Sequence, residues 1–275
     1  MSYNRPMDVD GHVHVWSDDA GRYPWRPIHG AEPPTIAGSA ESVLGVLAAN
    51  GVDVAVAVQP RAYGDDHAYL LDARRHHPER IVAVAALDPR DPTAPSALEV
   101  LVADGVRGLR LDPIGWGTRP LVDGTARPLW DRAARLGLAI ELMILPDQLP
   151  ALRPYAERTP GTTVVIEHTA RYGAAPDESL DSLLDLADLP NVFVKVSALS
   201  SISSEPPPHR DLWPLLERLF VEFGATRLMW GSDIPWIGAD AYGPAMDTIR
   251  ALPFLDNAGR GWLLGGTASR AFGID

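Results

Sequence analysis

Residues 7–16 read MDVDGHVHVW, an apolar segment that carries two histidines, His12 and His14, two positions apart. Side chains at positions i and i+2 of an extended strand lie on one face, so both imidazoles point the same way and together can bind one metal ion or one substrate. A matching stretch is residues 227–233, RLMWGSD, an apolar run that ends in the carboxylate of Asp233. If the chain closes into a barrel, these two segments become neighbours.

Short apolar runs rich in Val, Ile and Leu recur along the chain, and most are continuous, as in parallel strands covered on both faces. Each is followed by an amphipathic stretch of helical period, which is the pattern of repeated βα units. Eight runs are expected to form strands: 9–15, 52–59, 81–87, 106–111, 139–145, 163–168, 192–197 and 227–233. Eight such units predict a single α/β domain over residues 1–275, a (β/α)8 TIM-type barrel.

Helices are predicted between these strands. The first begins after Ser39, a good N-cap, and ends at Asn50-Gly51; Asp211 is expected to cap the seventh, with Pro214 in its first turn. The other helices are expected near 65–77, 95–103, 126–136, 147–158, 178–187, 212–223 and 257–271. Long loops are predicted over 16–38, 198–209 and 234–243, after strands one, seven and eight, where a barrel of this type places its active site.

Composition narrows the class of ligand. The chain has 275 residues, is 46% hydrophobic and carries a formal net charge of -12, which argues against nucleic acid or an anionic membrane as partner and favours a small molecule. It has no cysteine, which excludes disulfides, a thiolate zinc site and a cysteine nucleophile. No apolar run is long enough to span a bilayer and no secretory signal is evident, so a cytoplasmic protein is predicted. A homo-oligomer is left open.

Four polar groups lie on or at the ends of apolar strands: His12, His14, His168 and Asp233. Burial of such groups costs free energy unless they are paired or ligated, so their convergence at one rim of a barrel predicts a site. A hydrogen bond to a backbone carbonyl is the alternative for any one histidine. The chemistry that suits the set is activation of water, with a carboxylate as base and with imidazoles, or a metal that they hold, polarising the electrophile.

Two further polar residues end strands. Arg110, near the end of the fourth strand, is a candidate to bind a substrate carboxylate or hydroxyl, and an ion pair with Asp112 is the alternative. Gln59 ends the second strand, where it can donate to a substrate oxygen or cap the following turn. The chain has no Gly-Lys-Ser/Thr loop, no strand-linked GxGxxG and no GxSxG, so neither nucleotide binding nor a serine nucleophile is supported.

Lys195 lies within the apolar seventh strand, which predicts a buried acidic partner such as Glu141 or Glu167. Four aromatic residues are candidates to wall a pocket or stack on a sugar ring, with core packing as the alternative: Trp16, Tyr23, Trp25 and Trp236. The remaining histidines are expected to be solvated: His29, His67, His76, His77 and His209.

Several of these segments together resemble a family. They are Asp10–Trp16, Tyr23–Trp25, Val58-Gln59, Gly105–Arg110, Val165–His168, Val194–Ser197 and Trp230–Pro235. In this order, and over nearly the whole chain, they look like the amidohydrolase superfamily, in particular its amidohydrolase-related branch of sugar lactonases (fuconolactonase, rhamnonolactonase) and pyrone dicarboxylate lactonase. The resemblance implies that His12 and His14 line the metal or oxyanion position, that His168 supports the polarised carbonyl and that Asp233 takes a proton from water.

The fifth strand departs from the fuller superfamily pattern. Metal-dependent members usually place another ligand there, whereas residues 140–144 read IELMI, and neither leucine nor methionine binds a hard divalent ion well. Glu141 can act as a ligand if it faces inward, or it can position a substrate hydroxyl. Because imidazole and carboxylate suit zinc, the resemblance implies a zinc site of His12, His14 and Asp233. Some lactonases of this branch work without metal, so a metal-independent site is the alternative.

The resemblance and the site residues together predict a hydrolase that opens a small-molecule lactone with water activated by Asp233. Two alternative functions remain open. One is a metal-dependent decarboxylase of the same superfamily, against which the fifth strand counts. The other is a barrel that binds a small ligand without turning it over.

Overall fold

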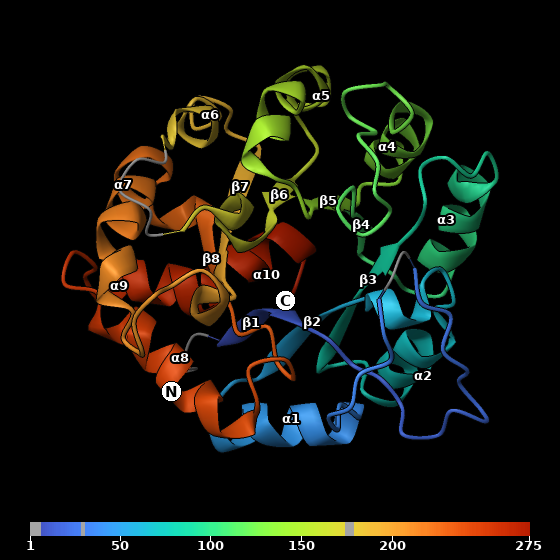
Figure 1. Cartoon of the computed structure of the whole chain (residues 1–275), viewed down its shortest axis with the longest axis horizontal. Helices are drawn as coiled ribbons and strands as arrows, with labels where there is room; N and C mark the ends of the chain where they lie inside the picture. Colours follow the sequence, from blue (N-terminus) through green and yellow to red (C-terminus); the bar gives the residue numbers. More distant parts are fainter. Residues whose placement is uncertain (1–6, 29–30, 174–178) are drawn as a thin grey trace.

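Eight parallel strands follow one another in chain order, β1 to β8, with the helices around them (Figure 1). The computed structural model describes residues 7–28, 31–173 and 179–275. The strands are β1 (Val9–Val13), β2 (Val54–Val58), β3 (Ile81–Ala86), β4 (Gly108–Leu111), β5 (Ala139–Leu142), β6 (Val164–Ile166), β7 (Val192–Ser197) and β8 (Leu228–Gly231). Each predicted strand is present, and the predicted (β/α)8 barrel is confirmed.

The barrel closes just beyond the ends of β8 and β1. The His14 backbone N–H donates to the Ile234 carbonyl (2.8 Å), and the Asp233 N–H donates to the His12 carbonyl (2.9 Å). An ideal Cβ on Gly231 would lie 2.6 Å from the Cβ of His12, so the two segments approach more closely than a larger residue would allow. The two segments singled out in the sequence are therefore neighbours.

The α-helices are α1 (Ala40–Ala49), α2 (Ala68–His76), α3 (Ala94–Ala103), α4 (Arg127–Arg135), α5 (Arg153–Arg158), α6 (Asp181–Leu184), α7 (Trp213–Phe223), α8 (Ala239–Ala251), α9 (Asn257–Gly261) and α10 (Thr267–Phe272). The 3-10 helices are η1 (Arg61–Tyr63), η2 (Pro146–Ala151), η3 (Glu167–Arg171), η4 (Leu199–Ser201), η5 (Arg210–Leu212) and η6 (Ala225–Arg227); η7 (Trp262–Gly266) is a π-helix. None of the helices in the described ranges is long and apolar enough to cross a membrane.

A bulge in β1 sets which side chains face the inside of the barrel. The register with β2 runs from the pair Val9–Val54 to the pair Val13–Ala57, so β1 uses one residue more than β2. A bulge of this kind reverses the alternation of side chains beyond it. Val9 therefore belongs to the apolar cluster inside the barrel, and the two histidines beyond the bulge also reach the interior.

Two apolar cores hold the fold. The larger lies between the strands and the surrounding helices, and the smaller fills the barrel at its N-terminal end with residues such as Val56, Val165 and Phe193. Helix α10 covers that end of the barrel, and its Ala268 and Phe272 belong to the inner core. Beyond this apolar filling, toward the C-terminal rim, the interior holds the buried charged residues Glu141, Glu167 and Lys195.

Four predictions about local structure are wrong. The loop predicted over 234–243 already contains the start of α8, whose apolar spacing Tyr242, Met246 and Ile249 is interrupted by Pro244. The helix predicted over 147–158 is η2 followed by α5, because prolines at 150 and 154 break a continuous helix.

The other two concern the start of α7 and the last predicted helix. Asp211 does not cap α7; its carboxylate instead accepts hydrogen bonds from Ser203 and Ser204 in the preceding loop. The helix predicted over 257–271 is divided into α9, η7 and α10, in a segment that holds four glycines between 259 and 266. Of the helix predicted over 178–187, the described part is α6, and residue 178 lies outside the described residues.

Candidate active site

A cavity of about 380 Å³ opens at the C-terminal ends of the strands. Its polar lining includes His14, His168 and Asp233, three of the four residues that the sequence singled out. Among the described residues, the lining consists of His14, Ala31, Glu32, Pro60, Arg61, Ala62, Arg110, Met143, His168, Arg171, Asp233 and Trp236. His12 lies directly behind this wall, fully buried, with its ring centroid 4.6 Å from that of His168 and 5.0 Å from that of His14.

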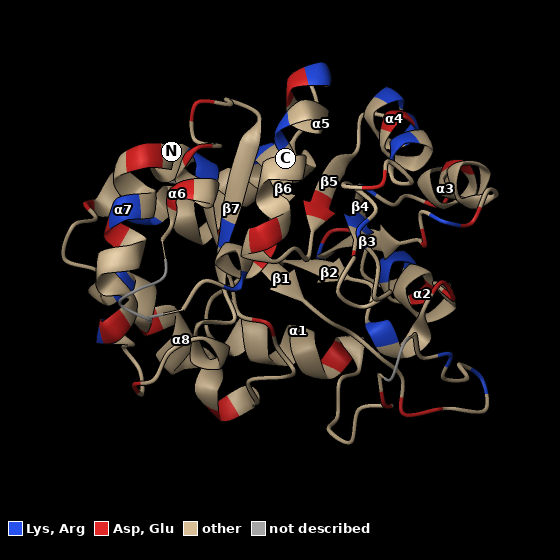
Figure 2. Ribbon diagram, turned by 45° about the horizontal axis from the view of Figure 1, so that its top comes forward, with Lys and Arg blue, Asp and Glu red and all other residues tan. Residues whose placement is uncertain are grey.

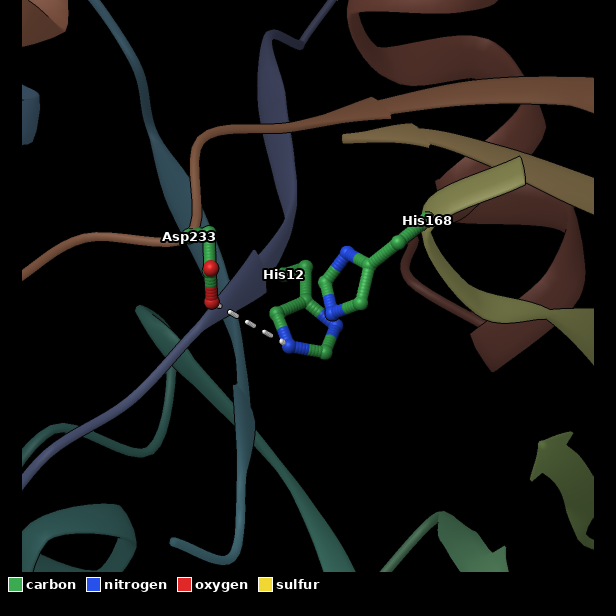
Figure 3. Close-up of side chains that lie close together, drawn as sticks. All are labelled: His12, His168 and Asp233. Atoms are coloured by element: carbon green, nitrogen blue, oxygen red, sulfur yellow. Dashed lines mark ion pairs between the residues drawn. The ribbon is translucent and has the colours of Figure 1, made fainter. Parts of the chain in front are cut away.

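Asp233 lies just after β8, where the barrel closes against β1. Its Oδ1 lies 3.5 Å from His14 Nε2 and 3.7 Å from His12 Nε2, and Figure 3 shows it facing His12. Its side chain is 17% exposed, into the cavity. Burial raises the pKa of Asp233 to about 7, although the nearby Arg110 opposes this shift. A carboxylate whose pKa lies near neutrality is suited to take up and return a proton.

The three imidazoles at the site are neutral at ordinary pH. Burial lowers the pKa of His14 to about 3, and the positive charge of Arg110 adds to this effect. Burial likewise holds the pKa of His12 and of His168 well below the usual value, with Lys195 and Arg110 respectively as the next causes. These rings therefore act as hydrogen-bond donors and acceptors and not as cations.

His168 is carried on an unusual turn. Four consecutive residues after β6, His168 to Arg171, have left-handed backbones with φ between 50° and 64°. None is glycine, and each left-handed residue costs about 1–2 kcal/mol. Such strain persists where the surrounding structure requires a particular geometry, and it is typical of functional sites. The turn directs both His168 and Arg171 into the cavity, and the Ser197 hydroxyl lies 2.8 Å from His168 Nδ1.

Asp10 connects β1 to the segment that follows β8, and it was not recognised as important in the sequence. Its Oδ1 accepts the backbone N–H groups of His12 (3.1 Å) and Ser232 (2.9 Å), and its Oδ2 accepts the Tyr242 hydroxyl (3.0 Å). Burial raises the pKa of Asp10 to about 6. The available signal was a carboxylate within an apolar strand, two residues before the first histidine. This side chain ties the histidine segment to the segment that carries Asp233.

Buried charges fill the barrel below the cavity, and Figure 2 shows a basic band on β7 and an acidic band on β5. Lys195 donates to Glu141 Oε1 (2.7 Å), which confirms the predicted buried acidic partner. Arg110 donates through Nε (3.1 Å) and Nη2 (2.8 Å) to Glu167 Oε2. Burial raises the pKa of Glu141, whereas Arg110 and Lys195 overcome the effect of burial at Glu167 and lower its pKa.

The remaining oxygens of this network indicate a shared proton. Glu141 Oε2 and Glu167 Oε1 are buried and have no hydrogen-bond partner if both groups are ionised. One proton held between the two carboxyl groups satisfies both oxygens and agrees with the opposite directions of their pKa shifts. Glu141, predicted to be a metal ligand or a substrate contact, therefore lies beneath the cavity and does not line it.

Among the other predicted substrate contacts, Arg110 and Trp236 line the cavity. The ion pair with Asp112, predicted as the alternative for Arg110, is present at 3.8 Å, and Arg110 also pairs with Glu167. Gln59 donates to the carbonyls of Gly64 and Asp66 and so caps the turn after β2, outside the cavity lining.

Of the four aromatic residues proposed from the sequence, Trp236 alone lines the cavity, and it is 48% exposed at the rim. Trp16 is buried behind it, with ring centroids 4.8 Å apart, and donates to the Ile36 carbonyl. Trp25 stacks on Tyr63, and the Tyr23 hydroxyl donates to Asp72, so these two lie outside the lining.

Two histidines predicted to be solvated are buried. His67 accepts the backbone N–H of Ala86 through Nε2 (3.1 Å), and His209 Nδ1 lies 2.7 Å from the Glu205 carbonyl. Each satisfies a backbone group, which a polar sequence context does not reveal. His76 is exposed as predicted and His77 is half-buried, while His29 lies outside the described residues.

Two arginines besides Arg110 line the cavity. Arg61 donates to both carboxylate oxygens of Asp112, at 2.5 and 2.7 Å. Arg171 donates to the Ser201 hydroxyl (3.2 Å), and within the described ranges no ion pair involves it. Arg171 was missed in the sequence; its position three residues after His168 was the signal.

The spacing of the donor atoms fits a divalent metal ion. Nε2 of His12, Nε2 of His14 and Oδ1 of Asp233 are separated by 3.3, 3.5 and 3.7 Å. Ligands bound to a tetrahedral zinc ion at its usual bond lengths lie ~3.3 Å apart. His168 also brings a ligand atom within 4.8 Å of those of His12 and Asp233, and Figure 3 shows these three side chains converging.

The hydrogen bonding of His12 does not fit a metal ligand. A ligating histidine usually donates its other ring N–H to a carboxylate, a carbonyl or water. His14 meets this condition, since its Nδ1 lies 2.8 Å from the Val58 carbonyl. His12 Nδ1 instead lies 3.2 Å from Lys195 Nζ, and an ammonium group cannot accept a hydrogen bond.

Comparison with known proteins places this chain in a family. The chain is 30% identical to the L-fucono-1,5-lactonase of Burkholderia ambifaria over 244 residues, which cover 82% of this chain and 80% of that protein. It is 28% identical to the 4-sulfomuconolactone hydrolase of Hydrogenophaga intermedia over 246 residues, covering 85% and 76% of the two chains.

A solved structure from Pseudomonas putida, described as a 2-pyrone-4,6-dicarboxylic acid hydrolase, shares the fold with a TM-score of 0.82. The two chains are 30% identical, with 99% of each covered. The family model for amidohydrolases matches residues 9–274, from the first strand to the end of the barrel. The chain therefore belongs to the amidohydrolase family.

Proposed function

We propose that this protein is a hydrolase that opens a small-molecule lactone with water activated by Asp233. The observation that carries the proposal is the position of this carboxylate, which lines the cavity, has a pKa raised to about 7 by burial and lies against two neutral imidazoles. The lactone hydrolases among the relatives support the same class of reaction.

In the proposed reaction, Asp233 takes a proton from a water molecule in the cavity, and the oxygen attacks the lactone carbonyl. The tetrahedral intermediate then expels the ring oxygen, which receives the proton from Asp233, so that the products are a carboxylic acid and an alcohol on one molecule. General base catalysis of this kind contributes typically about 10²–10⁴-fold in rate. Asp233 ends the cycle in its starting state.

Developing negative charge on the carbonyl oxygen needs donors fixed in advance. In our proposal His168 supplies one: its Nδ1 accepts from the Ser197 hydroxyl at 2.8 Å, so that the ring proton lies on Nε2 and is free to donate. Arg110, held in place by Glu167, supplies positive charge from the cavity wall. His14 Nε2 lies 3.5 Å from Asp233 Oδ1, and because burial keeps this ring neutral, the proton stays on Asp233 until the ring oxygen takes it.

The cavity wall favours a lactone that bears an acidic group. Arg61, Arg110 and Arg171 line the cavity, against Glu32 and Asp233 as the acidic residues. Arg61 and Arg110 are paired with carboxylates, which leaves Arg171 best placed to bind a carboxylate or sulfonate bidentately. Trp236 offers an apolar face at the rim.

A panel of lactones tests the proposal. It should contain neutral sugar lactones and lactones with one or two carboxylates, each assayed for ring opening with and without a chelator. Hydrolysis of an acidic lactone, well above that of its neutral counterpart, is the expected result. Failure of every lactone to open, together with release of carbon dioxide from an aromatic acid, would support the decarboxylase instead. Zinc in the site, with a metal-independent site as its alternative, and a cytoplasmic location remain predictions from the sequence, and a homo-oligomer is left open.

A further inference from the structure

The chain contains a single lysine, Lys195, whereas its other 23 basic residues are arginines. Lys195 is completely buried at the centre of the barrel, on β7 below the cavity. Every other basic position is an arginine, and the compact ammonium group of lysine occurs at this one position. The difference is geometric, because lysine offers three donors around a point charge, whereas arginine offers a planar fork.

The groups that surround Lys195 Nζ in the described part of the chain are electron-rich. Glu141 Oε1 lies 2.7 Å away, His12 Nδ1 lies 3.2 Å away, and the ring centroid of Phe272 lies 5.7 Å away. A carboxyl oxygen, an imidazole nitrogen and an aromatic face all favour a donor with positive charge. Phe272 comes from α10, the helix that covers the N-terminal end of the barrel, so the cation is held from below as well as from the side.

Donation from Lys195 determines where the proton of His12 lies. A neutral imidazole has one N–H, so a nitrogen that accepts from Lys195 at Nδ1 leaves that proton on Nε2. His12 Nε2 lies 3.3 Å from His14 Nε2, and His14 in turn donates from Nδ1 to the Val58 carbonyl (2.8 Å). The hydrogen bonds thus run in one direction, from Lys195 through both histidines to a backbone carbonyl, with every donor matched to an acceptor.

We propose that Lys195 is a positioning residue that fixes the proton of His12 on Nε2 and thereby makes His12 a hydrogen-bond donor instead of a metal ligand. The nitrogen that the HxH arrangement would offer to a metal is then protonated. It donates to His14 and lies 3.7 Å from Asp233, where it stabilises the ionised form of the base. This inference rests on the proposed function for its role in catalysis, and it predicts hydrolysis without bound zinc.

Nuclear magnetic resonance tests the hydrogen-bond direction without any lactone. In protein labelled with ¹⁵N at lysine, the side chain gives one Nζ signal, and the proposal expects an ammonium group shielded from exchange with water. In protein labelled at histidine, His12 should carry its proton on Nε2 and His14 on Nδ1. A His12 proton on Nδ1 in the wild-type protein would overturn the proposal, whatever the activity of the protein.

Two variants test the consequence for metal. Lys195→Met removes the donor while keeping an unbranched chain, and the double variant Lys195→Met/Glu141→Gln also removes the partner charge, in case the single change prevents folding. By calorimetric titration with zinc chloride, each folded variant should bind zinc at least tenfold more tightly than the wild type, and the His12 proton should move to Nδ1. Unchanged zinc affinity in the folded double variant would contradict the proposal.

Chelation separates this inference from the proposed function. Wild-type protein treated with a chelator should keep its activity on whichever lactone it opens, and purified wild-type protein should hold far less than one zinc per chain. Stoichiometric zinc, with activity lost on chelation and restored by zinc, would overturn the role given to Lys195 and leave lactone hydrolysis intact. Glu141→Gln alone, which keeps Lys195 next to His12, serves as the matched control and should keep the weak zinc binding of the wild type.

Discussion

Asp233 Oδ1 lies 3.5 Å from His14 Nε2, although the two residues come from opposite ends of the chain. The contact exists because β8 and β1 meet where the barrel closes, and because Asp10 ties the two segments together through Ser232. The proposed base is thus placed by the closure of the fold itself.

The pH dependence of catalysis should report the pKa of Asp233, which burial raises to about 7. A base must be ionised to accept a proton, so kcat/KM should rise about tenfold per pH unit below pH 7 and become level above it. The site histidines should add no further ionisation to the pH–rate profile in this range, since burial lowers their pKa values, that of His14 to about 3. A pH–rate profile from pH 5 to 9 measures this. A profile that is flat or falls with rising pH over that range contradicts the assignment.

The same shift predicts an effect on stability. A raised pKa means that ionised Asp233 is disfavoured in the folded state, so its cost is absent below pH 3.8 and complete above about pH 7. Asp233→Asn removes the charge and keeps the shape. Urea unfolding at pH 8 should show the variant more stable than the wild type, by up to about 4 kcal/mol, and the two should converge near pH 4. Equal free energies of unfolding for the variant and the wild type at pH 8 would show that burial does not disfavour the ionised carboxylate.

Ser197 is expected to act through His168, whose Nδ1 lies 2.8 Å from its hydroxyl. Ser197→Ala should lower kcat by about tenfold with KM within about twofold, because the ring loses its fixed orientation without losing substrate contacts. Steady-state kinetics on a lactone that the wild-type protein opens measures the separate effects on kcat and KM. Ser203→Ala, whose hydroxyl contacts Asp211 away from the cavity, is the matched control. A change confined to KM would indicate that Ser197 serves binding instead.

Arg171 is expected to select acidic lactones. Arg171→Ala should raise KM for a carboxylated lactone by about tenfold and leave the KM for a neutral lactone unchanged, because a charge-assisted bidentate contact is lost only with the former. Arg153→Ala provides the control, since this arginine pairs with Asp188 on the outside of the barrel. Equal changes for both lactones would assign Arg171 to the support of the cavity wall.

Much of the fold followed from the sequence because the strand pattern is local: apolar runs covered on both faces stand out against amphipathic helices. Helix α8 was missed for an equally local reason, since Pro244 interrupts the spacing of Tyr242 and Met246. The predicted residues His14, His168 and Asp233 share the cavity because strand ends meet at one rim of a barrel.

What the sequence could not supply depends on contacts between distant segments. By simple alternation Asp10 would share a face with His12, but the bulge in β1 separates them, and Asp10 reaches Tyr242 instead. The partner of His12 Nδ1 is 183 residues away, on β7, and only the closed barrel brings Lys195 to it. Gln59 was predicted to contact substrate from its place at a strand end and Trp16 from its aromatic ring, and the turn and packing that occupy them depend on later segments.

The most direct test of the account is the kcat/KM of Asp233→Asn, measured on a lactone that the wild-type protein opens. The amide keeps the shape of the side chain and cannot take a proton from water, so kcat/KM should fall by about 10²–10⁴-fold while the variant remains folded. Turnover close to that of the wild type would contradict the assignment of Asp233 as the base.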